Sequence, residues 1–321
     1  MGANDGASRR LRACAETVAR SVSGILSGRR GDAAPDTIMV SPSTDTRALS
    51  TLPVGMFDSG IGGLTVLHQC LVTLPGEDFV YFGDTARFPY GSKTQDELEL
   101  FSRQIATFLE VHGVKLLVVA CNSATAATLP LLQEEFETPI VGAVMPGARA
   151  AVQSSRWRRI GVLATEATVA SGSYPRAVHG LDHGAEVVMQ ACPGLAEYIQ
   201  DGDVASRELV DAVRAVTRPL REQRVDTVIM GSTHYPHIAP MLQRHLGRNV
   251  TLVSPAEEIA REVEEILDRQ GVTAEADGEG EYRFFCTGDV ESFREVGARF
   301  LQMPLEDVTH VPLERLADLP S

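Results

Sequence analysis

The chain has 321 residues, of which 44% are hydrophobic and 22% are charged, an ordinary composition for a globular protein of about two domains. Its formal net charge of −14 argues against nucleic acid as a partner. Proteins bind nucleic acid largely through clustered Lys and Arg, which release the counterions of the phosphates. The longest apolar runs are far shorter than the ~20 residues of a membrane helix, so we expect no membrane partner either.

Residues 1–50 differ from the rest of the chain, with seven Arg and five acidic residues. They contain no long apolar stretch, so a secretory signal is not expected. Residues 11–28 could form one amphipathic helix that docks on a partner. We favour the alternative that 1–50 is a mostly disordered extension.

From residue 54, short apolar runs alternate with helical stretches. Strand and helix in alternation predict an α/β fold with mainly parallel sheets flanked by helices. The predicted strands are 54–57, 79–82, 115–120, 140–144, 160–164, 186–190, 226–230, 250–253 and 282–286. The predicted helices are 62–73, 94–112, 123–136, 146–154, 205–222, 256–269 and 291–301.

An approximate internal repeat indicates two related halves. VGMFDSG at 54–60 resembles IGVLATE at 160–166, and KLLVVACNSAT at 115–125 resembles DTVIMGSTHYP at 226–236. We therefore expect two pseudo-symmetric domains, 51–148 plus 254–321 and 149–253. Ligands bind at the carboxyl ends of strands in such sheets, so Cys121 and Ser232 would approach one ligand from opposite sides.

Polar residues follow several predicted strands. Asp58 precedes the glycine-rich turn 60–63, where exposed N–H groups suit an anion; a simple helix cap is the equal alternative. Tyr90, between Pro89 and Gly91, is held rigidly and could bond a ligand through its hydroxyl, although a plain surface turn is the simpler explanation.

Cys121 lies between a strand and a helix, where the positive field of the helix start is expected to lower its thiol pKa. His234 follows the strand opposite it in the repeat. The five cysteines are scattered without a CxxC, and the histidines lack spacing such as HExxH. These patterns predict a reducing cytosol, no disulfide framework and no metal.

In this order the clusters resemble glutamate racemases of the aspartate/glutamate racemase superfamily. The similar segments are GMFDSGIGGLTVL, YFGDTARFPYGSK, VVACNSATAA, VGAVMPGA, STHYP and FCTGD, from about 54 to 302. The resemblance implies a cytoplasmic homodimer that acts on a small acidic amino acid or dicarboxylate, without metal, flavin or pyridoxal phosphate. It also implies a role in supplying D-glutamate for peptidoglycan.

By position, the resemblance makes Cys121 the first catalytic cysteine, Asp58 its supporting carboxylate and His234 the histidine that supports the second cysteine. The implied substrate-holding positions are Ser59, Pro89, Tyr90, Gly91, Asn122, Ser123, Thr168 and Thr233.

The second cysteine of the family is replaced by Ser232, and its supporting glutamate falls at Gln200. A serine hydroxyl is a much weaker acid than a thiol, so Ser232 or His234 would have to serve the second face. We therefore expect a racemase-type enzyme with Cys121 as the main acid/base. A one-thiol decarboxylase or isomerase of the same superfamily is the alternative, and a non-catalytic ligand-binding relic is the third hypothesis.

Overall fold

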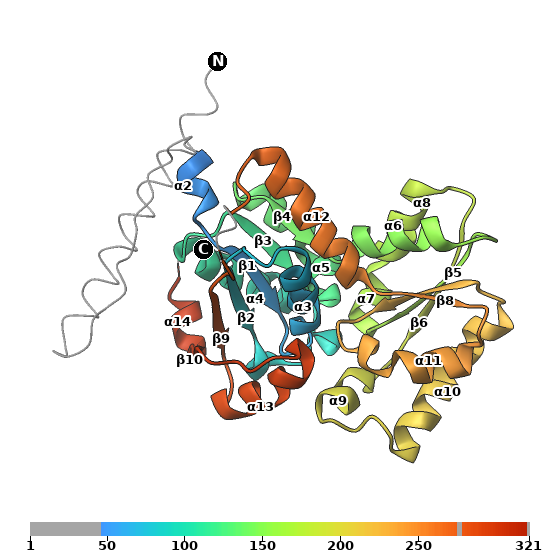
Figure 1. The fold of residues 1–321 in the computed structure, drawn as a ribbon. Helices are drawn as coiled ribbons and strands as arrows, with labels where there is room; N and C mark the ends of the chain where they lie inside the picture. The colour runs from blue at the N-terminus through green and yellow to red at the C-terminus, as the bar shows by residue number, and fades with distance from the viewer. Residues whose placement is uncertain (1–45, 275–277, 320–321) are drawn as a thin grey trace.

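The computed structural model describes residues 46–274 and 278–319. Two parallel sheets lie side by side, each flanked by helices (Figure 1). The six-stranded sheet has the order β10-β9-β2-β1-β3-β4, and the four-stranded sheet has the order β6-β5-β7-β8. The first sheet comprises β1 (Val54–Asp58), β2 (Phe79–Gly83), β3 (Leu116–Val119), β4 (Ile140–Gly142), β9 (Tyr282–Cys286) and β10 (Val308–His310); the second comprises β5 (Arg159–Ala164), β6 (Glu186–Ala191), β7 (Thr227–Gly231) and β8 (Thr251–Val253).

Helices follow most strands and cover both sheets (Figure 1). They are α2 (Thr46–Ser50), α3 (Leu64–Thr73), α4 (Gln95–Val111), α5 (Asn122–Glu135), α6 (Val144–Ser154), α7 (Glu166–Ser171), α8 (Ser173–Leu181), α9 (Leu195–Gln200), α10 (Arg207–Glu222), α11 (Ala239–Leu246), α12 (Pro255–Gln270), α13 (Val290–Leu301) and α14 (Leu313–Ala317), with 3-10 turns η2 (Thr85–Arg87), η3 (Tyr90–Ser92) and η4 (Tyr235–Ile238).

The predicted α/β class is confirmed, and the two halves share one strand order. Strands β2-β1-β3-β4 correspond to β6-β5-β7-β8, with every neighbouring pair parallel. The repeated segments of the sequence are therefore β1 with β5 and β3 with β7. This topology places the carboxyl ends of the equivalent strands where ligands bind in parallel α/β sheets.

Several short elements were not predicted. Strand β10 has three residues, and helices α2, α7, α9 and α14 have five or six, too short for a periodic apolar pattern. Gly172, with φ of +64°, separates α7 from α8. Residues 1–45, which include the possible helix at 11–28 and most of the predicted disordered extension, lie outside the described residues. Residues 46–50, at the end of that extension, form the helix α2.

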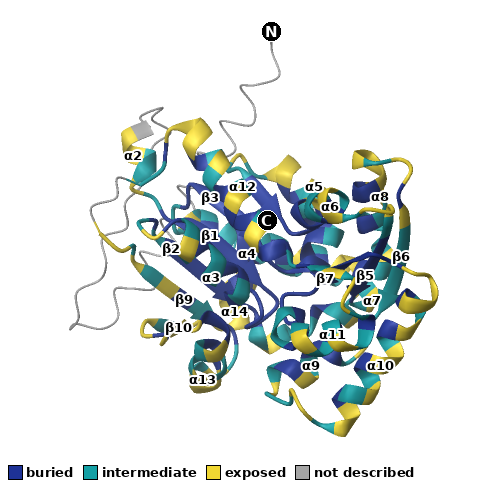
Figure 2. Ribbon diagram, turned by 45° about the vertical axis from the view of Figure 1, so that its right-hand side comes forward, coloured by how far each residue is buried: buried dark blue, intermediate teal, exposed yellow. Residues whose placement is uncertain are grey.

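The chain passes between the halves twice, through α6 after β4 and through α12 after β8. The predicted boundary at residue 148 falls inside α6. Helix α12 packs against both α3 and α6. One cluster of buried apolar side chains therefore runs through both halves, including Leu64, Val263 and Leu220, as the continuous buried interior in Figure 2 shows.

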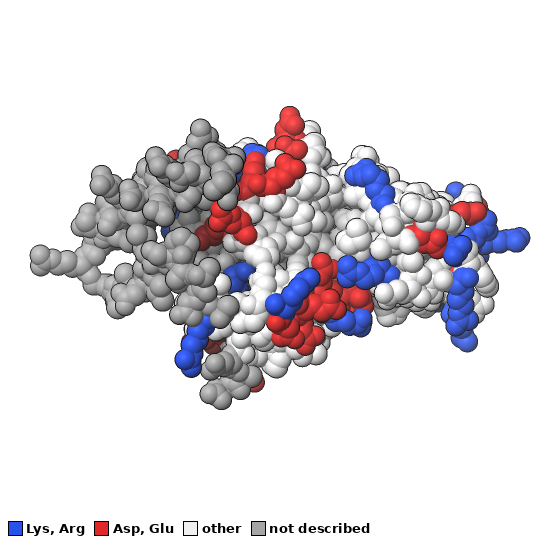
Figure 3. Space-filling view, turned by 90° about the horizontal axis from the view of Figure 1, so that it is seen from above, with Lys and Arg blue, Asp and Glu red and all other residues white. Residues whose placement is uncertain are grey.

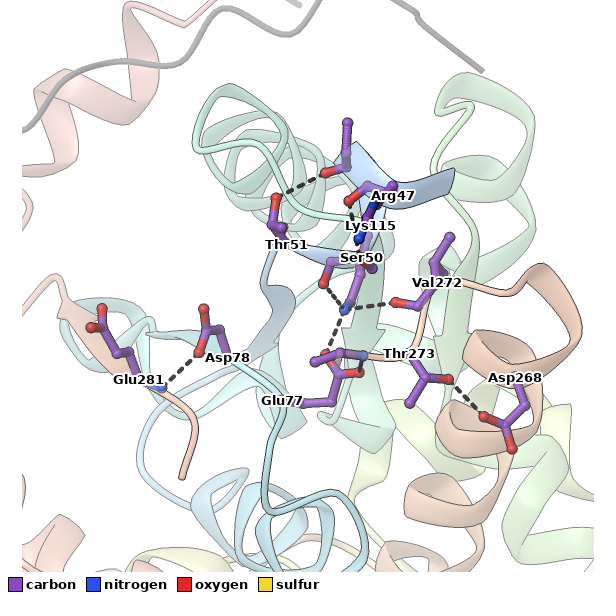
Figure 4. A network of polar contacts seen from close by, with 12 residues as sticks. Arg47, Ser50, Thr51, Glu77, Asp78, Lys115, Asp268, Val272, Thr273 and Glu281 are labelled. Carbon is purple, nitrogen blue, oxygen red and sulfur yellow. Dashed lines mark hydrogen bonds and ion pairs between the residues drawn. The ribbon is translucent and has the colours of Figure 1, made fainter. Parts of the chain in front are cut away.

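A buried ion pair ties together segments at the amino end of β3 (Figure 4). Lys115 Nζ lies 2.5 Å from Glu77 Oε2, with both side chains at most 2% exposed. The same ammonium donates to the carbonyl oxygens of Ser50 and Val272, each at 3.0 Å. Glu77 Oε1 accepts from the backbone N–H of Ala274 at 2.6 Å. The pair therefore holds α2 and the segment after α12 against the first sheet.

Charged side chains other than such pairs lie mostly on the outside. Figure 3 shows acidic side chains gathered over the middle of one face, and arginines at the end formed by the second half. Residues 149–253 carry 12 basic and 10 acidic residues, a net charge of +2, so the rest of the chain carries −16. None of the described helices is long and apolar enough to cross a membrane.

Candidate active site

A pocket opens between the carboxyl ends of strands from both halves. Ten of the predicted site residues line it: Ser59, Pro89, Tyr90, Gly91, Cys121, Asn122, Ser123, Ser232, Thr233 and His234. Four residues that sequence reasoning did not select also line it: Phe88, Thr165, Ala196 and Gly231. Asp58 and Thr168, both fully buried, lie behind this lining. Cys121 and Ser232 thus reach one pocket from the two halves, as the repeat predicted.

Asp58 ends β1 and is fully buried. Its Oδ1 accepts from the backbone N–H of Gly60 at 3.0 Å and from the Ser59 hydroxyl at 3.5 Å. Its Oδ2 accepts from the Thr233 hydroxyl of the other half at 3.4 Å. Burial raises the pKa of Asp58 to about 6 against the lowering effect of these donors. Its carboxyl can therefore hold or release a proton near neutral pH.

Cys121 is the N-cap residue of α5, and its Sγ accepts from the backbone N–H of Ala124 at 3.5 Å. The predicted position at the helix start is confirmed, but the predicted fall of its pKa is wrong. Burial, followed by the negative charge of Asp58, raises the pKa of Cys121 to about 12. The Ala124 N–H and the Ser59 donors lower it by less. Desolvation thus outweighs the helix field in the free protein.

Three hydroxyl groups meet at the junction of α5 and α7. Ser123 Oγ lies 2.8 Å from Thr165 Oγ1, and Thr165 Oγ1 donates to Thr168 Oγ1 at 3.1 Å. Thr165 caps α7 by accepting from the Thr168 N–H. Asn122 is fixed by the Tyr174 hydroxyl, which donates to its Oδ1 at 2.6 Å. This side of the pocket offers neutral hydrogen-bonding groups whose positions are set by both halves.

Tyr90 contributes differently from the prediction. Its hydroxyl donates to Asp84 Oδ2, which also forms an ion pair with Arg87 at 2.6 Å. Thr287 Oγ1 donates to Asp84 Oδ1 at 2.8 Å. Tyr90 lines the pocket, but its hydroxyl hydrogen is directed to Asp84 and not to a ligand. The network fixes the 84–91 loop against the first sheet.

Ser232, Thr233 and His234 follow β7 and form the second half's side of the pocket. Ser232 Oγ accepts from the backbone N–H of His234 at 3.4 Å. The His234 ring has Nε2 3.1 Å from Gln200 Oε1 and Nδ1 3.5 Å from Thr233 Oγ1. Since an amide oxygen only accepts, Nε2 carries the proton and Nδ1 is the acceptor. The contact places Gln200 on His234, where the resemblance put the supporting carboxylate.

His234 is a weak base in this setting. It is buried between the rings of Phe88 and Phe300, at centroid distances of 5.6 and 5.4 Å. Burial, followed by the charge of His237, lowers the pKa of His234 to about 3. Gln200 provides no charge that would stabilise an imidazolium. The imidazole is therefore neutral at physiological pH.

The close approach of the halves depends on Gly62. A Cβ at this position would overlap Thr233 Oγ1 and would lie 2.5 and 2.6 Å from His234 Cε1 and Nδ1. A Cβ on Gly63 would lie 2.5 Å from Asp58 Cβ. The glycine turn after β1 thus lets Asp58 and Thr233 meet.

Other groups with reactive potential are structural. Cys70, Cys192 and Cys286 are buried and free, and burial raises the pKa of each thiol. Within residues 46–274 and 278–319, no group of three or more His, Cys, Asp and Glu side chains is arranged to hold a metal ion.

Comparisons with known proteins agree with this architecture. The Asp/Glu/Hydantoin racemase family model matches residues 65–263. A glutamate racemase of Listeria monocytogenes is 40% identical over 260 residues, which are 81% of this chain and 98% of that protein.

Two solved structures share the fold. A glutamate racemase isoform of Bacillus anthracis superposes with a TM-score of 0.79 at 38% identity, over 82% of this chain and 98% of the other. The Francisella tularensis glutamate racemase, solved with D-glutamate, gives a TM-score of 0.78 at 31% identity, over 83% and 99%. The family expected from the sequence motifs is confirmed: this chain belongs to the Asp/Glu/Hydantoin racemase family.

Proposed function

We propose that this protein is a glutamate racemase-like isomerase that moves protons at the α-carbon of glutamate, with Cys121 as its thiol acid/base. One observation carries the proposal: Cys121 lines a pocket built by both halves, with Asp58 buried behind it, in a chain 40% identical to a glutamate racemase. No cofactor enters the proposed proton transfers.

The substrate supplies the charge that Cys121 needs. In the free protein the thiol is protonated, because burial and the Asp58 carboxylate disfavour a thiolate. An α-ammonium group bound near the thiol favours the thiolate, since an opposite charge within ~4–6 Å stabilises the charged form. Protonation of Asp58 removes the repulsion that it exerts on the thiolate. Glutamate binding and one proton on Asp58 would therefore activate Cys121 together.

Glutamate would be held by neutral donors. No Lys or Arg is among the residues that line the pocket. We assign its carboxylates and ammonium to Ser59, Asn122, Ser123 and Thr233, with the Pro89–Gly91 segment shaping one wall. Thr168 would act from behind this lining, through its hydrogen bond to Ser123. The Asn122 amide and the N–H groups at the start of α5 suit a carboxylate.

The second face of the substrate lacks a thiol. Ser232 is a poor acid and a poor base, and neutral His234 has little tendency to accept a proton. These features favour a second candidate, a decarboxylase or isomerase of the same superfamily that needs one proton delivery from Cys121. A ligand-binding relic is a third candidate, although the presence of both Asp58 and Cys121, close enough for the Asp58 charge to raise the pKa of the thiol, speaks against it.

The wider setting is also proposed from the family. The protein would act as a cytoplasmic homodimer that supplies D-glutamate for peptidoglycan. Its two domains would be 51–148 plus 254–321 and 149–253.

Titration calorimetry and polarimetry test the function together. Purified protein is titrated with D- and L-glutamate, and the optical rotation of each is then followed. Binding with decay of rotation, absent in a Cys121→Ala variant, is the expected result. Binding without decay would redirect the proposal to the one-thiol reactions. Absence of binding by both enantiomers would refute glutamate as the substrate.

A further inference from the structure

We propose that the Thr233 hydroxyl relays protons between Asp58 and the substrate face opposite Cys121, so that one thiol and one carboxyl serve the two faces. This inference rests on the proposed function and deepens it. It assigns the proton donor that replaces the missing second thiol.

The relay is a chain of contacts across the two halves. Thr233 Oγ1 lies 3.4 Å from Asp58 Oδ2 and 3.5 Å from His234 Nδ1. Thr233 lines the pocket together with Cys121, whereas Asp58 is fully buried behind the lining. Asp58 therefore has no direct path to the second half's side of the substrate, and the threonine hydroxyl supplies one.

The local fold is built around this contact. Gly62 leaves the space that Thr233 and His234 occupy, and Gly63 leaves space beside the Asp58 side chain. Any larger residue at Gly62 would overlap Thr233 Oγ1. The close packing holds the carboxyl and the hydroxyl together although their residues are 175 positions apart.

His234 orients the relay. Its Nε2–H donates to Gln200 Oε1, which leaves Nδ1 as an acceptor 3.5 Å from Thr233 Oγ1. The Thr233 hydroxyl has one hydrogen, so donation to Asp58 Oδ2, to His234 Nδ1 and to the substrate are alternative orientations of the same group. Ser232 Oγ accepts from the His234 backbone N–H, and no hydrogen bond among the described residues joins it to the imidazole ring. Thr233, rather than Ser232, is therefore the hydroxyl that has a carboxyl and an imidazole as partners.

The proton balance closes in one turnover. The starting state has a Cys121 thiolate and a protonated Asp58. The α-carbon–hydrogen bond breaks, an S–H bond forms on Cys121, and the electron pair stays on the α-carbon. Thr233 Oγ1 then gives its proton to the opposite face, while the Asp58 Oδ2 proton moves to Thr233 Oγ1. The end state has a Cys121 thiol, an Asp58 carboxylate, inverted substrate and unchanged net charge.

The end state is the starting state for the reverse direction. Thr233 and Asp58 then remove a proton, and Cys121 delivers one. Ser59 can interconvert the two states, because its hydroxyl lies 3.5 Å from Asp58 Oδ1 and also hydrogen-bonds with Cys121. A proton that passes from the Cys121 thiol through Ser59 to Asp58 resets the enzyme.

Three variants test the relay: Thr233→Val, which keeps the shape and removes the hydroxyl, Thr233→Ser, which keeps a hydroxyl, and Ser232→Ala. Each is incubated with D- and L-glutamate in D₂O, and α-proton exchange by NMR is compared with loss of rotation. We expect Thr233→Val to lower inversion by about 10²-fold while exchange of one enantiomer through Cys121 persists. Thr233→Ser should restore inversion, and Ser232→Ala should lower inversion much less than Thr233→Val does.

Inversion by Thr233→Val at the wild-type rate would overturn the relay. So would loss of inversion in Ser232→Ala alone, which would make Ser232 the second donor, or one-sided exchange without inversion in the wild type. Inversion by Thr233→Val, or its loss in Ser232→Ala alone, leaves the proposed function in place, because the wild type still inverts glutamate through Cys121. One-sided exchange without inversion in the wild type instead redirects the function to the one-thiol reactions. If the wild type exchanges neither enantiomer, the proposed function and the relay both fail.

Discussion

Replacement of Gly62 by alanine should separate the two sides of the site. The added methyl group would overlap Thr233 Oγ1 and would lie 2.5 Å from His234 Cε1, so the second half must move away from Asp58. Overpacking of this kind costs about 1–3 kcal/mol. A displacement of about 1 Å at reacting groups can lower a rate by about 10²-fold. We expect a modest loss of stability and a large loss of inversion.

Thermal unfolding and polarimetry measure the two effects of Gly62→Ala. Tm should fall by about 2–4 °C per kcal/mol. Gly180→Ala is the matched control, because Gly180 lies in α8 with nothing within 4 Å of an added Cβ. That substitution should stabilise the helix by about 0.5–1 kcal/mol and leave the rate unchanged. Wild-type inversion by Gly62→Ala would refute the requirement for close contact between Asp58 and the Thr233–His234 segment.

Three further substitutions test the electrostatics of the fold. Because burial raises the pKa of Asp58 to about 6, ionisation of Asp58 lowers the stability of the fold as pH rises from about 4 to about 6. Asp58→Asn should therefore recover on the order of 2–3 kcal/mol of stability above pH 6, while it abolishes inversion. Denaturant unfolding at pH 4 and pH 8 measures this effect, and an equal effect at both pH values would contradict it. Gln200→Glu places a carboxyl 3.1 Å from His234 Nε2 and should raise the pKa of His234 by about 1–3 units in an NMR titration, whereas an unchanged pKa would refute the role given to Gln200. Lys115→Met should destabilise the protein by about 3–5 kcal/mol, because it leaves Glu77 buried and unpaired. The double variant Lys115→Met/Glu77→Gln should recover most of that loss. Equal instability of the two variants in denaturant would contradict this explanation.

The sequence was informative about long elements and about residues at strand ends. The nine predicted strands correspond to β1 to β9, each within two residues of its observed ends, because each is an apolar run bounded by turn residues. The repeat correctly brought Cys121 and Ser232 to one pocket. Apolar periodicity is a local signal, and an internal repeat is visible within one sequence, so both could be found without an alignment.

What escaped prediction depends on contacts between distant segments. The pKa of Cys121 was predicted in the wrong direction, because the helix start is visible in the sequence but the extent of burial is not. Thr165 and Ala196 line the pocket only after the second half packs against the first. Tyr90 was expected to present its hydroxyl, yet Asp84 takes it. The Asp58–Thr233 contact joins positions 175 residues apart, and no local sequence pattern indicates it.

The proposed chemistry depends most on Cys121 as the group that moves the α-proton. The most direct measurement is proton NMR of D-glutamate and L-glutamate, each incubated in D₂O with the wild type or with Cys121→Ala. We expect deuterium to replace the α-proton of at least one enantiomer with the wild type and of neither with Cys121→Ala. Exchange at the same rate by Cys121→Ala, or no exchange by the wild type, would contradict this expectation.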